Sequence, residues 1–124
     1  MSFCTVVNCM DGRVQLPVLT FLKERFNVQF VDNVTEPGPV LILAERKNSS
    51  LLKSILKRIQ ISVERHGSNG IAVVAHHDCA GNPRSKQIQL DQLKEAISFL
   101  KTHFKDIEIV GLWVNAKWQV EEIN

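Results

Sequence analysis

The sequence predicts an α/β fold in one domain over residues 1–124, with a mostly parallel β-sheet flanked by helices. Short apolar runs rich in β-branched residues alternate along the chain with longer segments whose apolar residues recur at helical spacing. A length of 124 residues is within the usual range of a single domain. The composition, 44% hydrophobic and 23% charged, is that of an ordinary globular protein.

The chain begins with a strand, a helix and a second strand. The run FCTVVNC, residues 3–9, is continuously apolar and β-branched, which predicts a strand buried on both faces. A helix follows from Leu16, since Pro17 suits a first turn. Its apolar face consists of Val18, Phe21, Leu22 and Phe26. The run VQFVDNV, residues 28–34, predicts the second strand.

The middle of the chain contains one ambiguous segment and one clear helix. In TEPGPVLILAERKNSS, residues 35–50, the prolines favour a loop, whereas VLIL suits a short strand or a buried connector. That segment stays open between these alternatives. Ser49 or Ser50 then caps a helix with regular apolar spacing, which Gly67 closes. The run GIAVVAH, residues 70–76, predicts the third strand.

The last part of the chain predicts one more helix and one more strand. Apolar residues between Leu90 and Phe104 keep helical spacing, and IEIVGLWV, residues 107–114, has the character of a buried strand. Because strands and helices alternate, the strands are expected to be mostly parallel. Ligands of such sheets bind just beyond the carboxyl ends of the strands.

Charge and hydropathy argue against two classes of partner. The net charge is +2, and acidic and basic residues are interspersed, so we expect no nucleic-acid partner. The N-terminal stretch MSFCTVVNCMDGR has no charged leader, and its apolar run is too short for a signal peptide or a membrane span, so we expect a cytoplasmic protein with no membrane partner. The chain has an odd number of cysteines, namely Cys4, Cys9 and Cys79. An odd number suits a reducing compartment and argues against a disulfide framework.

Two cysteines and a histidine are placed at strand ends. Cys9 ends the first predicted strand, His76 ends the third, and Cys79 follows it in the stretch AHHDCAGNP. Since carboxyl ends of parallel strands share one edge of the sheet, these side chains are expected to converge. Two thiolates and an imidazole are a common ligand set for zinc. Three protein ligands leave one position for water and favour a catalytic site, unless Asp11 or a partner supplies the fourth ligand.

The stretch CMDGR adds a carboxylate and a guanidinium beside the first thiol, and Asp11 and Arg13 can form a bidentate bridge. The pattern Cys9-x-Asp11-x-Arg13, followed later by His76-x-x-Cys79, resembles the two signatures of the β-class carbonic anhydrases in their usual order. The tail IEIVGLWVNAKWQVEEI is also similar to the last strand and closing hairpin of that family. The resemblance therefore covers most of the chain.

The resemblance implies a β-carbonic-anhydrase-like fold and a zinc-dependent carbonate dehydratase, a lyase in which zinc-bound hydroxide attacks carbon dioxide to give bicarbonate. Cys9, His76 and Cys79 would then bind Zn²⁺. Asp11 and Arg13 would form a catalytic dyad in which Arg13 keeps Asp11 ionised and away from the metal. The small-molecule partner would be carbon dioxide or bicarbonate, and the protein would be a homodimer. Because two thiolates cancel the formal charge of the ion, activity is expected to rise towards alkaline pH.

Two departures from the family pattern keep other functions open. Asp32–Thr35, followed by EPGP, stands where the family has Arg-Asn-Ala-Gly after the second strand, and Ala80 stands where it has glycine. A divergent member could be a zinc-binding pseudo-enzyme, or another zinc hydrolase or lyase that acts on a small electrophile. A thiol enzyme with Cys9 as nucleophile beside Arg13 is a further alternative, although Asp11 would repel an anionic substrate.

Several other residues are expected to have structural roles. Cys4 lies within the first strand and belongs to the core, and His77 is out of phase with His76 on the third strand. The same expectation covers two histidines near helix ends and two tryptophans, namely His66, His103, Trp113 and Trp118. Glu36 and Asn33 are further candidates for the pocket wall.

Overall fold

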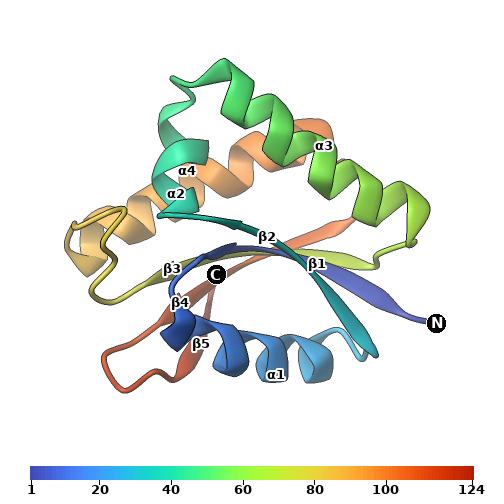
Figure 1. The fold of residues 1–124 in the computed structure, drawn as a ribbon, viewed down its shortest axis with the longest axis horizontal. Coiled ribbons are helices and arrows are strands. Elements are labelled where there is room, and N and C mark those ends of the chain that lie inside the picture. Colours follow the sequence, from blue (N-terminus) through green and yellow to red (C-terminus); the bar gives the residue numbers. More distant parts are fainter.

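The computed structural model describes residues 1–124 and contains one five-stranded β-sheet with helices on both faces (Figure 1). In chain order the elements are β1 (Phe3–Cys9), the 3-10 turn η1 (Gly12–Val14), α1 (Gln15–Arg25), β2 (Phe30–Glu36), α2 (Pro39–Glu45), α3 (Ser49–Arg65), β3 (Gly70–His76), α4 (Lys86–His103), β4 (Glu108–Val114) and β5 (Val120–Ile123). The predicted α/β fold is confirmed.

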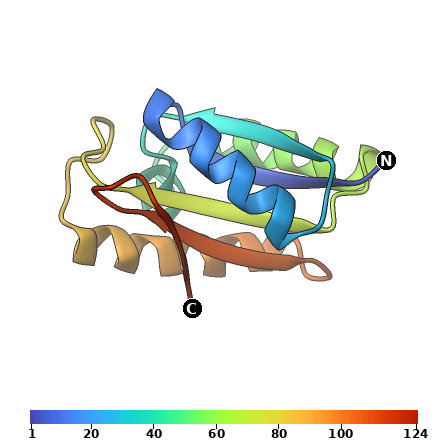
Figure 2. The same ribbon diagram turned by 90° about the horizontal axis from the view of Figure 1, so that it is seen from below.

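The strand order in the sheet is β2-β1-β3-β4-β5. The first four strands are parallel to their neighbours, and β5 returns antiparallel to β4 as a closing hairpin. Helix α1 covers one face, whereas α2, α3 and α4 cover the other (Figure 1). Figure 2 shows α1 lying alone across its face of the sheet.

The central strands are buried because helices cover both of their faces. Alternate residues of a strand point to opposite faces, so each strand contributes to two cores. Val7 and Val73 pack with the helices on the α3 side, while Val6 and Val74 pack on the α1 side. The β-branched side chains that predicted these strands therefore fill the two layers between sheet and helices.

The helices begin and end at residues that can be identified in the sequence. Val18 and Leu22, four residues apart, form the buried stripe of α1. Helix α3 is capped by Asn48, whose side chain accepts a hydrogen bond from the backbone N–H of Leu51 at 3.0 Å. The predicted cap at Ser49 or Ser50 is therefore one or two residues too late, since both serines lie within the helix. None of the helices combines the length and apolar character needed to cross a membrane.

Two segments differ from the prediction. The second strand runs from Phe30 to Glu36 instead of over residues 28–34, because it pairs with β1 along its whole length up to the partner of Cys9. It is an edge strand, so its last residues can be polar. In the segment left open after it, VLIL forms part of the helix α2, whose buried residues include Val40 and Leu43, whereas residues 37–38 and 46–48 are irregular.

The connections make a topological switch point of the carboxyl ends of β1 and β3. From β1 the chain passes over one face of the sheet to β2, and then returns over the other face to β3 on the opposite side of β1. Neighbouring strands whose connections leave in opposite directions form a topological switch point, where ligands of parallel sheets bind.

Candidate metal centre

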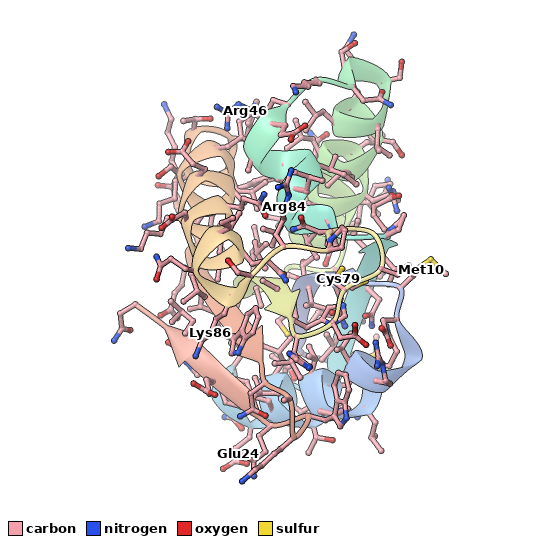
Figure 3. All side chains as sticks on the ribbon, turned by 90° about the vertical axis from the view of Figure 1, so that its left-hand side faces the viewer. Met10, Glu24, Arg46, Cys79, Arg84 and Lys86 are labelled. Atoms are coloured by element: carbon pink, nitrogen blue, oxygen red, sulfur yellow. The ribbon has the colours of Figure 1, made fainter.

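Two thiols and an imidazole meet at this switch point. Cys9 is the last residue of β1, His76 is the last residue of β3, and Cys79 lies on the loop that leaves β3. All of them are buried. Figure 3 shows this end of the molecule, with Cys79 on the loop near the centre and Met10 at its side. The structure thus brings together the residues that the sequence proposed as metal ligands.

The spacing of the donor atoms fits a metal ion. The ligand atoms of Cys9, His76 and Cys79 all lie within 4.8 Å of one another. The two Sγ atoms are 3.9 Å apart. Two thiolates on one tetrahedral zinc ion, each at about 2.3 Å, would be about 3.8 Å apart. The group can therefore hold a metal ion without a rearrangement of the two cysteines.

The imidazole of His76 is oriented for ligation. Its Nδ1 lies 2.7 Å from the backbone carbonyl of His77, which makes Nδ1 the donor and leaves the lone pair on Nε2. Nε2 is buried and has no hydrogen-bond partner. A buried polar atom without a partner is costly unless a ligand satisfies it. The donor set fits a metal because this unpaired nitrogen lies close to two thiols and lacks the partner that a metal ion would supply.

The hydrogen-bonded pair of thiols favours a state in which Cys9 is the thiolate and Cys79 keeps its proton. Their hydrogen bond lowers the pKa of Cys9, although burial opposes this change, and His76 lowers it further. The same hydrogen bond, followed by burial, raises the pKa of Cys79. The pair therefore retains one proton, which a divalent cation would displace because metals bind cysteine as thiolate.

Backbone amides support each sulfur. The N–H groups of Gly38 and Asp11 favour the thiolate form of Cys9, and those of Asn82 and Gly81 do the same for Cys79. Hydrogen bonds of this kind delocalise charge from a thiolate and hold it in place. The loops after β1, β2 and β3 therefore complete the surroundings of the two sulfurs.

The two loops approach each other backbone to backbone, which requires glycine on both sides. Gly38 has φ +62°, in the left-handed region that disfavours side chains. A Cβ on Gly81 would lie 2.6 Å from the carbonyl carbon of Pro37. Because β2 extends to Glu36, the segment at this edge of the site is Pro37–Gly38, and Asp32–Thr35 belong to the strand.

We expect Gly81→Ala to destabilise the fold, because its Cβ would collide with the backbone at Pro37. Overpacking of this kind costs about 1–3 kcal/mol in the free energy of unfolding. Urea denaturation of the metal-free protein measures it. Gly12→Ala is the matched control, since nothing lies within 4 Å of a Cβ at that position. Equal stabilities of the two variants would contradict the close approach.

Asp11 and Arg13 form the expected bidentate bridge. Arg13 donates from Nη2 to Oδ2 of Asp11 at 2.7 Å and from Nε to Oδ1 at 3.1 Å. The backbone N–H of Arg13 also donates to Oδ1 at 2.9 Å. The side-chain hydrogen bonds from Arg13 are the main reason that the pKa of Asp11 is lowered to about 2. Asp11 is therefore a carboxylate at all physiological pH values, and it is held on Arg13 rather than among the metal-binding atoms.

Gln89 is a site residue that the sequence reasoning missed. Its side-chain N–H donates to the backbone carbonyl of His76 at 3.0 Å, and its side-chain oxygen accepts from the backbone N–H of His76 at 3.3 Å. Gln89 shares the buried face of α4 with Leu93 and Ala96. The signal in the sequence was a polar residue that recurs in phase with the apolar residues of a helix. Such a residue is buried, and a buried amide needs hydrogen-bond partners.

Three other expectations about site residues have different outcomes. Glu36 is ion-paired with Arg58 on α3. Asn33 is exposed and donates to the carbonyl of Val31. Trp118 is half-buried and packs against the core on the α1 side of the sheet, as expected, and its ring also covers the guanidinium of Arg13, with Cζ 4.4 Å from the ring centroid. The sequence did not indicate this contact because the two residues are far apart in the chain.

A cavity of about 320 Å³ opens beside Cys79. It lies between the loop that leaves β3, the start of α4 and the end of β4, and its lining residues are His77, Asp78, Cys79, Pro83, Arg84, Ser85, Lys86 and Trp113. Figure 3 shows Arg84 and Lys86 following Cys79 along this loop into α4. Of the three residues with metal-binding atoms, Cys79 is the one that lines this cavity.

Comparison with known families gives a match over the whole chain. The family model described as "Putative carbonic anhydrase" matches residues 1–124, which is the whole chain. No curated protein matches the sequence.

Proposed function

The chain belongs to this carbonic anhydrase family, and from that membership we propose that it is a zinc-dependent lyase that hydrates carbon dioxide to bicarbonate. The observation that carries the proposal is the buried group of Cys9, His76 and Cys79 at the switch point of the sheet, beside an ionised Asp11. The family supports the reaction, and the donor atoms support the metal.

Three side chains would hold the metal. Cys9 and Cys79 would bind zinc as thiolates, and His76 would bind it through Nε2. When bound, zinc would supply a hydroxide nucleophile from water near neutral pH. The hydrogen bond from His76 Nδ1 to the His77 carbonyl would keep the imidazole in the ligating tautomer.

Asp11 and Arg13 would orient the reaction without binding the metal. The carboxylate of Asp11 would accept the hydrogen bond of the attacking hydroxyl group and turn its lone pair towards the carbon of carbon dioxide. Arg13 would hold that carboxylate in place and keep it ionised. Arg13 would also keep Asp11 from closing the metal site as a fourth ligand.

We expect the hydration rate to rise between pH 7 and pH 9 in stopped-flow measurements on the zinc-loaded protein. The two thiolates cancel the formal charge of a divalent ion, so water loses its proton less readily than beside three neutral imidazoles. Asp11 does not contribute to this slope, because its pKa is lowered to about 2 and it is already ionised throughout the range.

Other outcomes of that measurement assign the protein differently. Zinc binding without hydration at any pH would favour a zinc-binding pseudo-enzyme, or a hydrolase or lyase for another small electrophile, and would overturn the proposed reaction. The homodimer and the cytoplasmic location expected from the sequence stay predictions.

A further inference from the structure

Arg13 makes more contacts than a bridge to Asp11 requires. Its Nη1 donates to Oδ2 of Asp78 at 3.2 Å, and its Nη2 donates to the backbone carbonyl of Asp78 at 3.0 Å. The ring of Trp118 covers the guanidinium, with Cζ 4.4 Å from the centroid. None of these contacts involves Asp11. The guanidinium is therefore held from two further segments of the chain.

Asp78 presents two acceptors to Arg13 because of its backbone conformation. Its φ is 57°, in the left-handed region that few residues other than glycine adopt and that aspartate and asparagine tolerate best. Its carbonyl and carboxylate oxygens both reach Arg13 in this conformation. Cys79, the residue after Asp78, is a proposed ligand, so the loop after β3 carries both a metal-binding side chain and an anchor for Arg13.

Trp118 is held by the turn between β4 and β5. Its backbone N–H donates to the carbonyl of Asn115 at 2.9 Å. The side-chain oxygen of Asn115 accepts from the backbone N–H groups of Lys117 and Gln119 at 2.9 Å and 3.0 Å. The ring of His77 packs against Trp118 edge-on, with centroids 6.3 Å apart. The turn is thus tied together and lies at the same end of the molecule as the loop after β3 (Figure 1).

We propose that Asp78 and Trp118 are positioning residues for Arg13, which they hold in place independently of Asp11. The proposal rests on the proposed function, in which Arg13 orients Asp11 beside the metal. Asp11 has a short side chain, and Arg13 is the only residue that donates hydrogen bonds to its carboxylate. The Asp11 carboxylate is therefore placed by the backbone N–H and the guanidinium of Arg13 together, and Asp78 and Trp118 hold the guanidinium.

The exposure of these groups limits the size of the effect. The side chains of Arg13 and Asp78 are 44% and 70% exposed, so their ion pair is screened by water. Removing one exposed ion pair or one exposed cation–π contact is expected to loosen Arg13 by about two- to fivefold. Removing both contacts is expected to have a larger effect than removing either one, because each single variant keeps one of the two anchors of Arg13.

The test is nuclear magnetic resonance of the Arg13 side chain in the zinc-loaded protein. The variants are Asp78→Asn and Trp118→Ala, singly and together. Asparagine keeps the left-handed backbone, so Asp78→Asn changes the charge without straining the loop. Trp118→Phe keeps a ring over the guanidinium, and Asp106→Asn, at an exposed residue outside any ion pair, is the matched control.

We expect solvent exchange of the Arg13 Nε proton to be faster by about two- to fivefold in each single variant and faster still in the double variant. Trp118→Phe should restore most of the protection lost in Trp118→Ala, and Asp106→Asn should change nothing. Zinc content should stay at the wild-type value throughout. Where carbon dioxide is hydrated, kcat should fall in the same order as the protection.

Unchanged exchange of the Arg13 proton in Asp78→Asn and in the double variant would overturn the proposal, even if kcat fell. Failure of the proposed function gives a different result, because a wild-type protein that binds zinc but does not hydrate carbon dioxide would still show the Arg13 exchange rates. If Trp118→Ala does not fold, the exchange rate of the Arg13 Nε proton in Asp78→Asn still decides the matter.

Discussion

Replacing Cys79 with alanine is expected to remove zinc from the protein. The variant leaves one thiolate and one imidazole, which is too few protein ligands for a stable zinc site. Loss of outer-shell partners alone costs about 10–100-fold in metal affinity, so loss of a direct ligand is expected to cost more than about 100-fold. Zinc per chain, measured after dialysis by atomic spectroscopy, should fall from one to near zero.

Cys4→Ala is the matched control for that experiment. Cys4 is also a buried free cysteine on β1, but it packs in the core on the α1 side of the sheet. The control should keep its zinc. Equal zinc contents in the Cys79 and Cys4 variants, whether both high or both low, would contradict the assignment of Cys79 as a ligand.

Asp11→Asn is expected to lower kcat/KM for carbon dioxide hydration by about 100-fold, the lower limit of a positioned acid–base group. Asparagine fills the same space but carries no charge, so it cannot form the bidentate charge-assisted bridge with Arg13. Zinc content should not change, because Asp11 is not among the metal-binding atoms.

Stopped-flow hydration assays on zinc-loaded samples, with Asp106→Asn as a charge-matched control, measure this loss. A wild-type rate in Asp11→Asn would show that the carboxylate takes no part in the reaction. Loss of zinc together with activity would instead indicate that Asp11 is a ligand.

The inner strands could be predicted because buried strands consist almost entirely of apolar residues. The run at residues 70–76 is β3 as observed, since a strand covered on both faces must be continuously apolar. The edge strand β2 is partly exposed and ends in the polar residues Thr35 and Glu36, which gave no boundary signal, and the prediction was two residues too early. Helix α2 was missed because Pro39 at its first turn and the short length concealed the helical pattern.

The ligands could be located from the sequence because parallel strand ends share an edge of the sheet. Cys9, His76 and Cys79 therefore needed only the strand assignments. The second layer around them could not be located in this way. Gly38, the Asp78 loop and Trp118 act through contacts between segments far apart in the chain, and only the folded structure brings these segments together.

X-ray absorption at the zinc edge of the purified protein tests the central claim, that Cys9, His76 and Cys79 form a zinc centre. The account predicts one zinc per chain with two sulfur neighbours at about 2.3 Å and nitrogen or oxygen neighbours at about 2.0 Å. A protein that takes up no zinc, or a zinc shell without sulfur, would contradict it.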